Sequence, residues 1–373
     1  MIKILHTADM HLGREFPILR QKGKDYRRQL LATFERIMNL AIEELASIVL
    51  IAGDLFDTNR VHGDVIETVL RGFGELERRS IRVCICPGTH DVYDDESIYR
   101  FVGFPSNVAV LTPDRHHVSL KDLDLTVYGK AFDGKLVGKS PLDQLTLVEE
   151  SKYHVGIAHC SIRKEGWIEK DSMILDTKEI GASRLDYLAL GHWHSFQDYS
   201  QGNTKAYYCG SPEPIYMDQK GAGNVVIINI HEKGNIEVKP VRVGSKEFDE
   251  MTIDIGPVKS MNDIAETIRN KANPDLILKV TLEGLGSMDC DINAQGIEDE
   301  LSDAFFGLRV FDKSHPKLEE VKAEVFPEQT VIGRFVRILE RRIAEANEED
   351  KVLYGEALKL GFALLEGRSQ VIE

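Results

Sequence analysis

The chain has 373 residues, enough for one large domain with one or two small ones, and its net charge of -15 disfavours binding of polyanions over the whole surface without excluding a local nucleic-acid site. No run approaches the roughly 18 apolar residues of a membrane-spanning helix, and "MIKILHTADMHLG" lacks a basic leader, so we expect a cytoplasmic protein with no membrane contact. The five cysteines contain no CxxC pair, which argues against a disulfide framework.

Short β-rich runs alternate with amphipathic helical stretches from residue 1 to about 245. The early runs are continuously apolar, as in strands covered on both faces, so we expect an α/β domain with helices outside. The predicted strands are 2–8, 47–53, 82–86, 125–129, 153–159, 186–191, 206–210 and 224–230, and the predicted helices are 27–46 and 63–79.

Two smaller parts follow this domain. Residues 250–313 again mix strand and helix patterns, with turn signals at Asn273-Pro274 and around Gly284, and predict a separate small α/β unit. Residues 317–367 are helical in pattern, and an "ANEEDK" turn divides them into two amphipathic helices. The two apolar stripes are Val331, Ile332, Phe335, Val336, Leu339 and Ile343, then Leu353, Ala357, Leu358, Phe362 and Leu365.

Five predicted strands end in residues that bind metals, each followed by a loop. The ends of neighbouring strands lie together at one edge of an α/β sheet, so residues far apart in sequence converge there. Carboxylates together with imidazoles favour Mn, Fe or Zn, and two such metals can bind a phosphate. The five pieces are Asp9-x-His11, Asp54, His90, His159 and His192-x-His194.

Each piece alone has a simpler interpretation. Thr89 and Asp91 are ordinary turn and cap residues, and a single histidine beside a strand is usually a satisfied core or surface group. Five such pieces, each at a strand end and most beside glycine, favour a two-metal site, in which Asp54 is the natural bridge because a carboxylate presents two oxygens.

The series "DMHLG", "GDLFD", "GTHD", "GIAH" and "GHWH", followed by "YYCGSPEP", resembles the calcineurin-like metallophosphoesterases over residues 1 to about 245. Within that superfamily, "HTADMHLGREF" and "AGDLFDTNRV", with the small unit and the helical tail, resemble the SbcD-type DNA repair exonucleases. The resemblance implies two β-sheets flanked by helices over 1–245, an α/β capping domain over 250–313 and a helical partner-binding segment over 317–367.

The resemblance also implies a site. The first metal would be held by Asp9, His11, Asp54 and His194, and the second by Asp54, His159 and His192. His90 would act on the scissile phosphate as a general acid or stabiliser, with Asp91 orienting it. The family usually has Asn where this chain has Thr89, and a hydroxyl is a poorer ligand than an amide carbonyl. We therefore expect weaker binding of the second metal.

Other residues have competing interpretations. Trp193 could stack a base, but packing that fixes its two histidine neighbours is favoured, and Cys84 and Cys86 are expected in the core. His6 and His154 lie inside predicted strands and are expected to be core or supporting groups. Arg14, Lys22 and Arg60 follow ligand strands and could hold DNA phosphates or simply be solvated loop charges.

The implied activity is a metal-dependent DNA phosphodiesterase, an exonuclease on duplex ends and an endonuclease on single strands, using two divalent ions expected to be Mn²⁺. The implied partners are DNA, an SbcC-type ATPase bound through the C-terminal helices, and a second copy of the chain. Two alternatives stay open: a phosphoesterase for small molecules, and an adaptor for DNA ends that has lost its second metal through Thr89. The tail helices could also pack only on their own domain.

Overall fold

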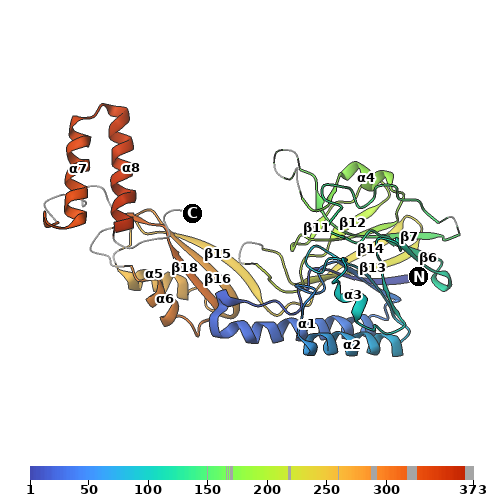
Figure 1. The fold of residues 1–373 in the computed structure, drawn as a ribbon. Coiled ribbons are helices and arrows are strands. Elements are labelled where there is room, and N and C mark those ends of the chain that lie inside the picture. The colour runs from blue at the N-terminus through green and yellow to red at the C-terminus, as the bar shows by residue number, and fades with distance from the viewer. Residues whose placement is uncertain are drawn as a thin grey trace. The chain divides into compact units, whose positions relative to one another are not determined.

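The computed structural model describes the chain except for residues 149, 165, 167, 169–170, 217–219, 259, 287–291, 317–325 and 366–373. It contains two compact units, residues 1–248 and 249–373 (Figure 1). The predicted division of the second unit into a cap and a tail stays a proposal, and residues 317–325 of the predicted tail lie outside the described residues. Within the described ranges, no helix is long and apolar enough to span a membrane.

The first unit is built on two six-stranded sheets. The first sheet has the order β14-β13-β1-β2-β3-β4, with β1 to β4 parallel and the β13–β14 hairpin antiparallel at one side. Its strands are β1 (Ile2–Thr7), β2 (Ile48–Ala52), β3 (Arg82–Cys86), β4 (Val108–Val110), β13 (Asn224–Glu232) and β14 (Asn235–Arg242).

The second sheet has the order β11-β12-β10-β7-β6-β5, in which β6, β7, β10 and β12 are parallel. Successive side chains of a strand point to opposite faces. Alternate apolar residues such as Ile4 and Leu50 in one sheet, and Val155 and Ala189 in the other, therefore meet in one buried core. The strands are β5 (His117–Leu120), β6 (Leu125–Gly129), β7 (Tyr153–His159), β10 (Tyr187–Gly191), β11 (Gln197–Asp198) and β12 (Lys205–Tyr208).

The helices and remaining strands of this unit complete the two-sheet sandwich. Two long amphipathic helices, α1 and α2, pack on each other, and α2 also packs on β3. The Ile180 side chain of the short helix α4 joins a second core on the outer face of the second sheet. The remaining elements are α1 (Gly23–Glu43), α2 (Gly63–Arg78), α3 (Ile98–Phe101), α4 (Thr177–Ala182), the 3-10 helices η1 (Pro17–Lys22) and η2 (Lys121–Leu123), and the strands β8 (Ser161–Ile162) and β9 (Ile174–Leu175).

The predicted α/β architecture is confirmed, and all eight predicted strands of this unit are present within two residues at either end. Helix α1 begins four residues earlier than predicted, at Gly23, and buries Tyr26 completely. Strands β4, β5 and β14 were not predicted. They are short or half exposed, so they lack the continuous apolar run that marks the central strands.

The second unit combines a small sheet with a helical hairpin. Strands β15, β16 and β18 lie side by side, with β16 and β18 parallel, and helices α7 and α8 share a core of Val336, Leu339, Leu358 and Phe362. Helix α6 ends at Glu300, shortly before strand β18 begins at Phe305. The elements are β15 (Glu247–Asp254), α5 (Met261–Arg269), β16 (Asn273–Glu283), β17 (Leu285–Gly286), α6 (Ala294–Glu300), β18 (Phe305–Asp312), β19 (His315–Pro316), α7 (Val331–Glu345) and α8 (Glu348–Leu365).

Candidate metal centre

The carboxyl ends of strands from both sheets meet at one site in the first unit. Asp9 and His11 follow β1, Asp54 follows β2, His159 ends β7, and His194 follows β10. Three groups form there, and within each, ligand atoms lie within 4.8 Å of one another. Two are fully buried, Asp9 with His11 and His194, and Asp9 with Asp54 and His159; the third, partly exposed, is His11 with Asp57 and His90. The predicted convergence of strand ends is therefore present.

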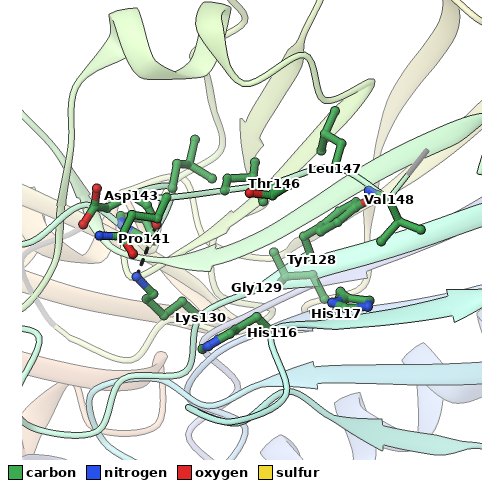
Figure 2. Close-up of a pocket in the computed structure, with 14 residues that line it drawn as sticks. His116, His117, Tyr128, Gly129, Lys130, Pro141, Asp143, Thr146, Leu147 and Val148 are labelled. Atoms are coloured by element: carbon green, nitrogen blue, oxygen red, sulfur yellow. Dashed lines mark hydrogen bonds between the residues drawn. The ribbon is translucent and has the colours of Figure 1, made fainter.

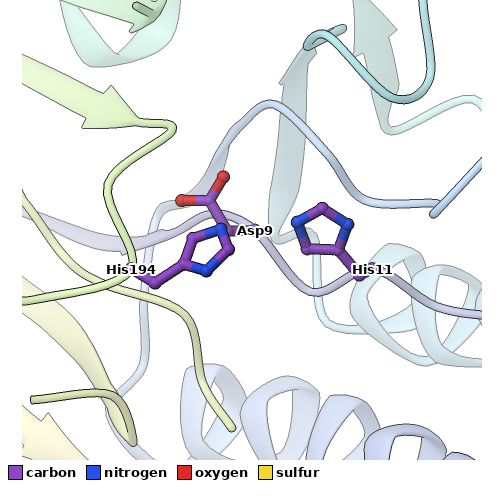
Figure 3. A group of neighbouring side chains, drawn as sticks. All are labelled: Asp9, His11 and His194. Carbon is purple, nitrogen blue, oxygen red and sulfur yellow. The ribbon is translucent and has the colours of Figure 1, made fainter. Parts of the chain in front are cut away.

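Asp9, His11 and His194 form the first group, and Figure 3 shows the three side chains gathered around a common space. All three are buried. His11 Nε2 and His194 Nδ1 are buried without a hydrogen-bond partner among the described residues. A buried ring nitrogen without a partner carries a desolvation penalty of about 1–3 kcal/mol, which a bound cation removes. This donor set fits a divalent metal ion.

The second group surrounds His159. Its Nε2 lies 3.2 Å from Asp54 Oδ2, 3.3 Å from His192 Nδ1 and 3.4 Å from Thr89 Oγ1. His159 Nδ1 lies 3.0 Å from the Ala52 carbonyl oxygen, so the ring proton sits on Nδ1 and the Nε2 lone pair faces the group. These donors also fit a cation, with the Thr89 hydroxyl beside them.

Asp54 lies between the two groups. Its Oδ2 is 3.2 Å from His159 Nε2 and 3.7 Å from His11 Nε2, while its Oδ1 accepts a hydrogen bond from the backbone nitrogen of His90 at 2.9 Å. One oxygen is thus held by the protein, and the other is shared by the two imidazoles. This geometry suits a carboxylate that bridges two metals.

The backbone at the site is strained. Asp9, His11, Asp54 and His192 have φ angles of 52°, 45°, 50° and 103°, which L-residues rarely adopt. Such conformations cost on the order of 1–3 kcal/mol each and cluster at functional sites. Gly53, which directly precedes Asp54, has φ 87°, and a Cβ at this position would overlap the His159 ring. These backbone conformations therefore lower the stability of the fold while they direct the side chains toward the site.

Charge is concentrated at the site. Burial raises the pKa of Asp9 to about 7, against the opposing effect of His159. Burial alone would lower the pKa of His159, but the carboxylates of Asp54 and Asp9 raise it to about 10. Burial and the neighbouring His11 lower the pKa of His194, which keeps this imidazole neutral and able to bind a metal. The carboxylates attract positive charge, while the imidazoles supply lone pairs.

His90 and Asp91 do not form the expected pair. The Asp91 carboxylate is buried and accepts hydrogen bonds from the backbone of Gly88 at 2.7 Å and Phe56 at 3.2 Å, and from the Tyr99 hydroxyl at 2.5 Å. Within the described part of the chain, no hydrogen bond joins it to His90. The expected orienting role of Asp91 is therefore corrected: its acceptors are directed at the loop backbone and Tyr99, so it holds the loop that carries His90.

The orientation of His90 comes from Asp57. His90 Nδ1 lies 3.2 Å from the Asp57 carbonyl oxygen and 3.8 Å from its carboxylate. The same carboxylate is 3.0 Å from His11 Nδ1 and accepts a hydrogen bond from Arg14 at 2.8 Å. Sequence analysis missed this residue, although its position in "GDLFD", three residues after Asp54, placed it near the site.

Tyr216 and Asp171 were also missed. The Tyr216 ring stacks on His194 with centroids 5.4 Å apart, and the Arg14 guanidinium lies 4.3 Å from its centroid. Asp171 Oδ2 lies 2.9 Å from His192 Nε2. No motif marks either residue, because their distance in sequence from their partners leaves no local pattern.

The remaining candidates lie outside the ligand groups. Trp193 packs against the outer core of the second sheet and donates to Ser161, as the packing interpretation expects. Cys84 and Cys86 are buried, and so is His6, which contacts Tyr187. His154 is buried against Tyr128. Arg14 is held by Asp57, Arg60 pairs with Glu96 on the surface, and Lys22 ends the 3-10 helix η1.

A separate cavity of about 380 Å³ lies between loop 141–148 and the residues of β5 and β6 (Figure 2). Apolar side chains such as Leu142 and Leu147 line it together with His116, His117 and Lys130. It contains none of the candidate metal ligands, so it is not part of the metal centre.

A two-sheet α/β sandwich with buried carboxylates and imidazoles at its strand ends defines a metal-dependent hydrolase. Residues 2–196 match the family model described as calcineurin-like phosphoesterase, and the chain belongs to this family. It is therefore a metal-dependent phosphoester hydrolase with a divalent metal centre.

The chain is similar to several named proteins. It is 25% identical to the DNA double-strand break repair protein Mre11 of Methanopyrus kandleri, over 80% of this chain and 68% of that protein. It is 23% identical to the Mre11 of Sulfolobus acidocaldarius, over 94% of both chains. It is also 21% identical to the uncharacterized metallophosphoesterase YhaO of Bacillus subtilis, over 76% of this chain and 72% of that protein.

Proposed function

We propose that the chain is a DNA nuclease of double-strand break repair that hydrolyses phosphodiester bonds with two Mn²⁺ ions. The observation that carries this proposal is the shared Asp54 oxygen between two imidazole groups. The names of the relatives matched over most of the chain support DNA as the substrate. A mixed carboxylate and imidazole donor set supports Mn²⁺ over Mg²⁺, which prefers oxygen ligands alone.

In this proposal Asp9, His11, Asp54 and His194 hold the first metal, and Asp54, His159 and His192 hold the second, with Thr89 beside it. When bound, two such ions neutralise phosphate charge and lower the pKa of a water molecule enough to make it a nucleophile near neutral pH. The buried nitrogens of His11 and His194 without partners support the first assignment. The three polar atoms around His159 Nε2 support the second.

His90 is proposed to act on the substrate directly. Its side chain is 36% exposed, unlike the buried candidate ligands, and its Nδ1 is directed at the Asp57 carbonyl oxygen. In the protonated ring, Nε2 is then free to donate to a phosphate oxygen or to the departing 3′ oxygen as the P–O bond breaks. The Asp57 carboxylate lies 3.8 Å from Nδ1.

The nuclease proposal is tested on the purified full chain with end-labelled duplex and single-stranded circular DNA, in Mn²⁺ and in EDTA. We expect Mn²⁺-dependent cleavage that falls about 100-fold or more in His90→Ala, as for loss of a general acid. The control His231→Ala changes an exposed histidine of β13 and should cleave normally.

Each other outcome favours a different function. Hydrolysis of a generic phosphodiester without DNA cleavage would favour a small-molecule phosphoesterase or a nuclease that needs its ATPase. Inactivity on both substrates, with fewer than two metals bound, would favour the adaptor. Localisation in the cytoplasm and pairing of two copies are proposed from the resemblance alone.

We further propose that the α7–α8 hairpin binds an SbcC-type ATPase. The hairpin has its own core, yet its outer surface exposes Val331 and Ile338 on α7 and Val352 and Leu353 on α8, each at least 58% exposed. Residues 331 and 338 lie seven apart, so they share one face of α7. An apolar face outside a satisfied core is typical of helix-in-groove recognition.

The partner proposal predicts that deletion of residues 318–373 leaves a folded phosphoesterase that no longer co-purifies with the cognate ATPase. Collapse of the truncated protein would instead favour packing on its own unit. In the full chain, Ile338→Glu with Leu353→Glu should abolish co-purification, whereas Ala344→Glu, on another exposed face of α7, should not. Retained binding by the double variant would refute this surface.

A further inference from the structure

Asp171 is connected to the candidate metal centre through two side chains. Its Oδ2 lies 2.9 Å from His192 Nε2 and accepts a hydrogen bond from Ser161 Oγ at 2.5 Å, while its Oδ1 accepts one from the Ser172 backbone at 2.6 Å. The Trp193 indole donates to the same Ser161 hydroxyl at 3.2 Å. The carboxylate is therefore fixed from several sides as it meets the imidazole.

The Asp171 contact determines which nitrogen of His192 carries the proton. An ionised carboxylate can only accept, so His192 Nε2 must be the donor, and Nδ1 of the neutral ring keeps its lone pair. His192 Nδ1 lies 3.3 Å from His159 Nε2. The Nδ1 atom of His159 is directed at the Ala52 carbonyl oxygen, which leaves Nε2 to face His192. At this distance both nitrogens can direct a lone pair at one bound cation.

The ionised state of Asp171 is favoured by its partners. The Ser161 hydroxyl and the Ser172 backbone nitrogen both donate hydrogen bonds to its side chain, and such donors stabilise a carboxylate. A carboxylate behind an imidazole also makes the ring a stronger electron donor. This matters more here because Thr89 offers the second metal only a hydroxyl, 3.4 Å from His159 Nε2.

We propose that Asp171 is a positioning residue for the second metal, holding His192 with Nδ1 toward His159 and compensating for the weak Thr89 ligand. This inference rests on the ligand assignment under the proposed function. It concerns binding of the metal and is independent of whether the substrate is DNA.

The test is a calorimetric titration of the EDTA-treated full chain with Mn²⁺. Wild type is expected to bind two ions. In Asp171→Ala, the affinity of one site should fall about 10- to 100-fold, the usual effect of removing a carboxylate behind a ligand histidine, while the other site is unchanged. The matched control is Asp143→Asn, which changes an exposed carboxylate on the loop drawn in Figure 2.

A second substitution that restores metal affinity distinguishes a positioning role of Asp171 from general damage to the fold. Adding Thr89→Asn to Asp171→Ala supplies an amide ligand at the same site and should restore at least part of the lost affinity. Asp171→Asn keeps an acceptor without the charge, so its loss should be smaller than that of Asp171→Ala but greater than that of the control. If Asp171→Ala does not fold, the Mn²⁺ affinity of Asp171→Asn tests the role of Asp171 instead.

Three results would overturn the inference: affinities equal to the Asp143→Asn control, equal weakening of both sites, or no rescue by Thr89→Asn. If wild type itself binds fewer than two Mn²⁺ ions, the ligand assignment falls along with this inference. Two intact sites in every Asp171 variant would refute the role of Asp171 alone.

Discussion

Replacing Gly53 by alanine puts a methyl group against the ring of His159. Gly53 has φ 87°, and the added Cβ would lie 2.7 Å from His159 Cβ and closer still to the ring nitrogen Nδ1, whereas ordinary contacts are 3.4–4 Å. The His159 side chain cannot move away freely, because it is buried and its Nδ1 is held by the Ala52 carbonyl oxygen.

The cost has two parts. An L-residue forced to positive φ costs roughly 1–2 kcal/mol, and overpacking a buried site adds about 1–3 kcal/mol. Relief of the overlap requires the imidazole to retreat by roughly an ångström, while metal–ligand distances tolerate only about 0.2 Å. A displacement of that size can lower activity about 100-fold. We expect Gly53→Ala to lose the second metal and at least that much activity.

The assay compares metal content after gel filtration and Mn²⁺-dependent hydrolysis of a generic phosphodiester in Gly53→Ala and Gly134→Ala. Gly134 also has positive φ, at 78°, but no atom lies within 4 Å of an added Cβ, so its variant carries the backbone strain without the overlap. If both variants keep two metals and equal rates, His159 is not a ligand held in place by Gly53.

Three further predictions follow from individual contacts. His6 has a pKa lowered to about 3 by burial; the unfolded chain takes up the proton below pH 6.5 while the native chain does not, so stability falls as pH drops. In urea unfolding followed by tryptophan fluorescence, His6→Asn, which can keep the Tyr187 contact, should reduce the fall between pH 7 and 5 by about 2 kcal/mol, and an unchanged pH dependence would refute it. Thr89→Asn should tighten the weaker Mn²⁺ site in calorimetry, and an unchanged affinity would show that the hydroxyl is no handicap. Tyr99→Phe removes the hydrogen bond to the buried Asp91 carboxylate and should lower the free energy of unfolding by about 1.5–3 kcal/mol; a change below 0.5 kcal/mol, on the order of a typical surface substitution, would contradict the role of Asp91 in holding the loop.

The central strands and the candidate ligands were accessible from the sequence because each has a local signature. A continuous apolar run ending in a polar residue marks both the buried strand and the residue at its end, as in the segment from Ile48 to Asp54. Parallel strands then bring such ends together by topology alone. The candidate ligands between Asp9 and His194 could therefore be predicted from the sequence alone.

The directions of these side chains depend on contacts between segments that are distant in sequence. The partners of His192 and His11 are Asp171 and Asp57, 21 and 46 residues away, and the Asp91 carboxylate turned to Gly88, Phe56 and Tyr99 instead of His90. Which nitrogen of an imidazole carries its proton depends on the acceptor that packing places beside it, and no periodic pattern records that contact. The local sequence patterns therefore predict which groups meet at the strand ends, and the packing of distant loops sets which lone pairs face the candidate metal sites.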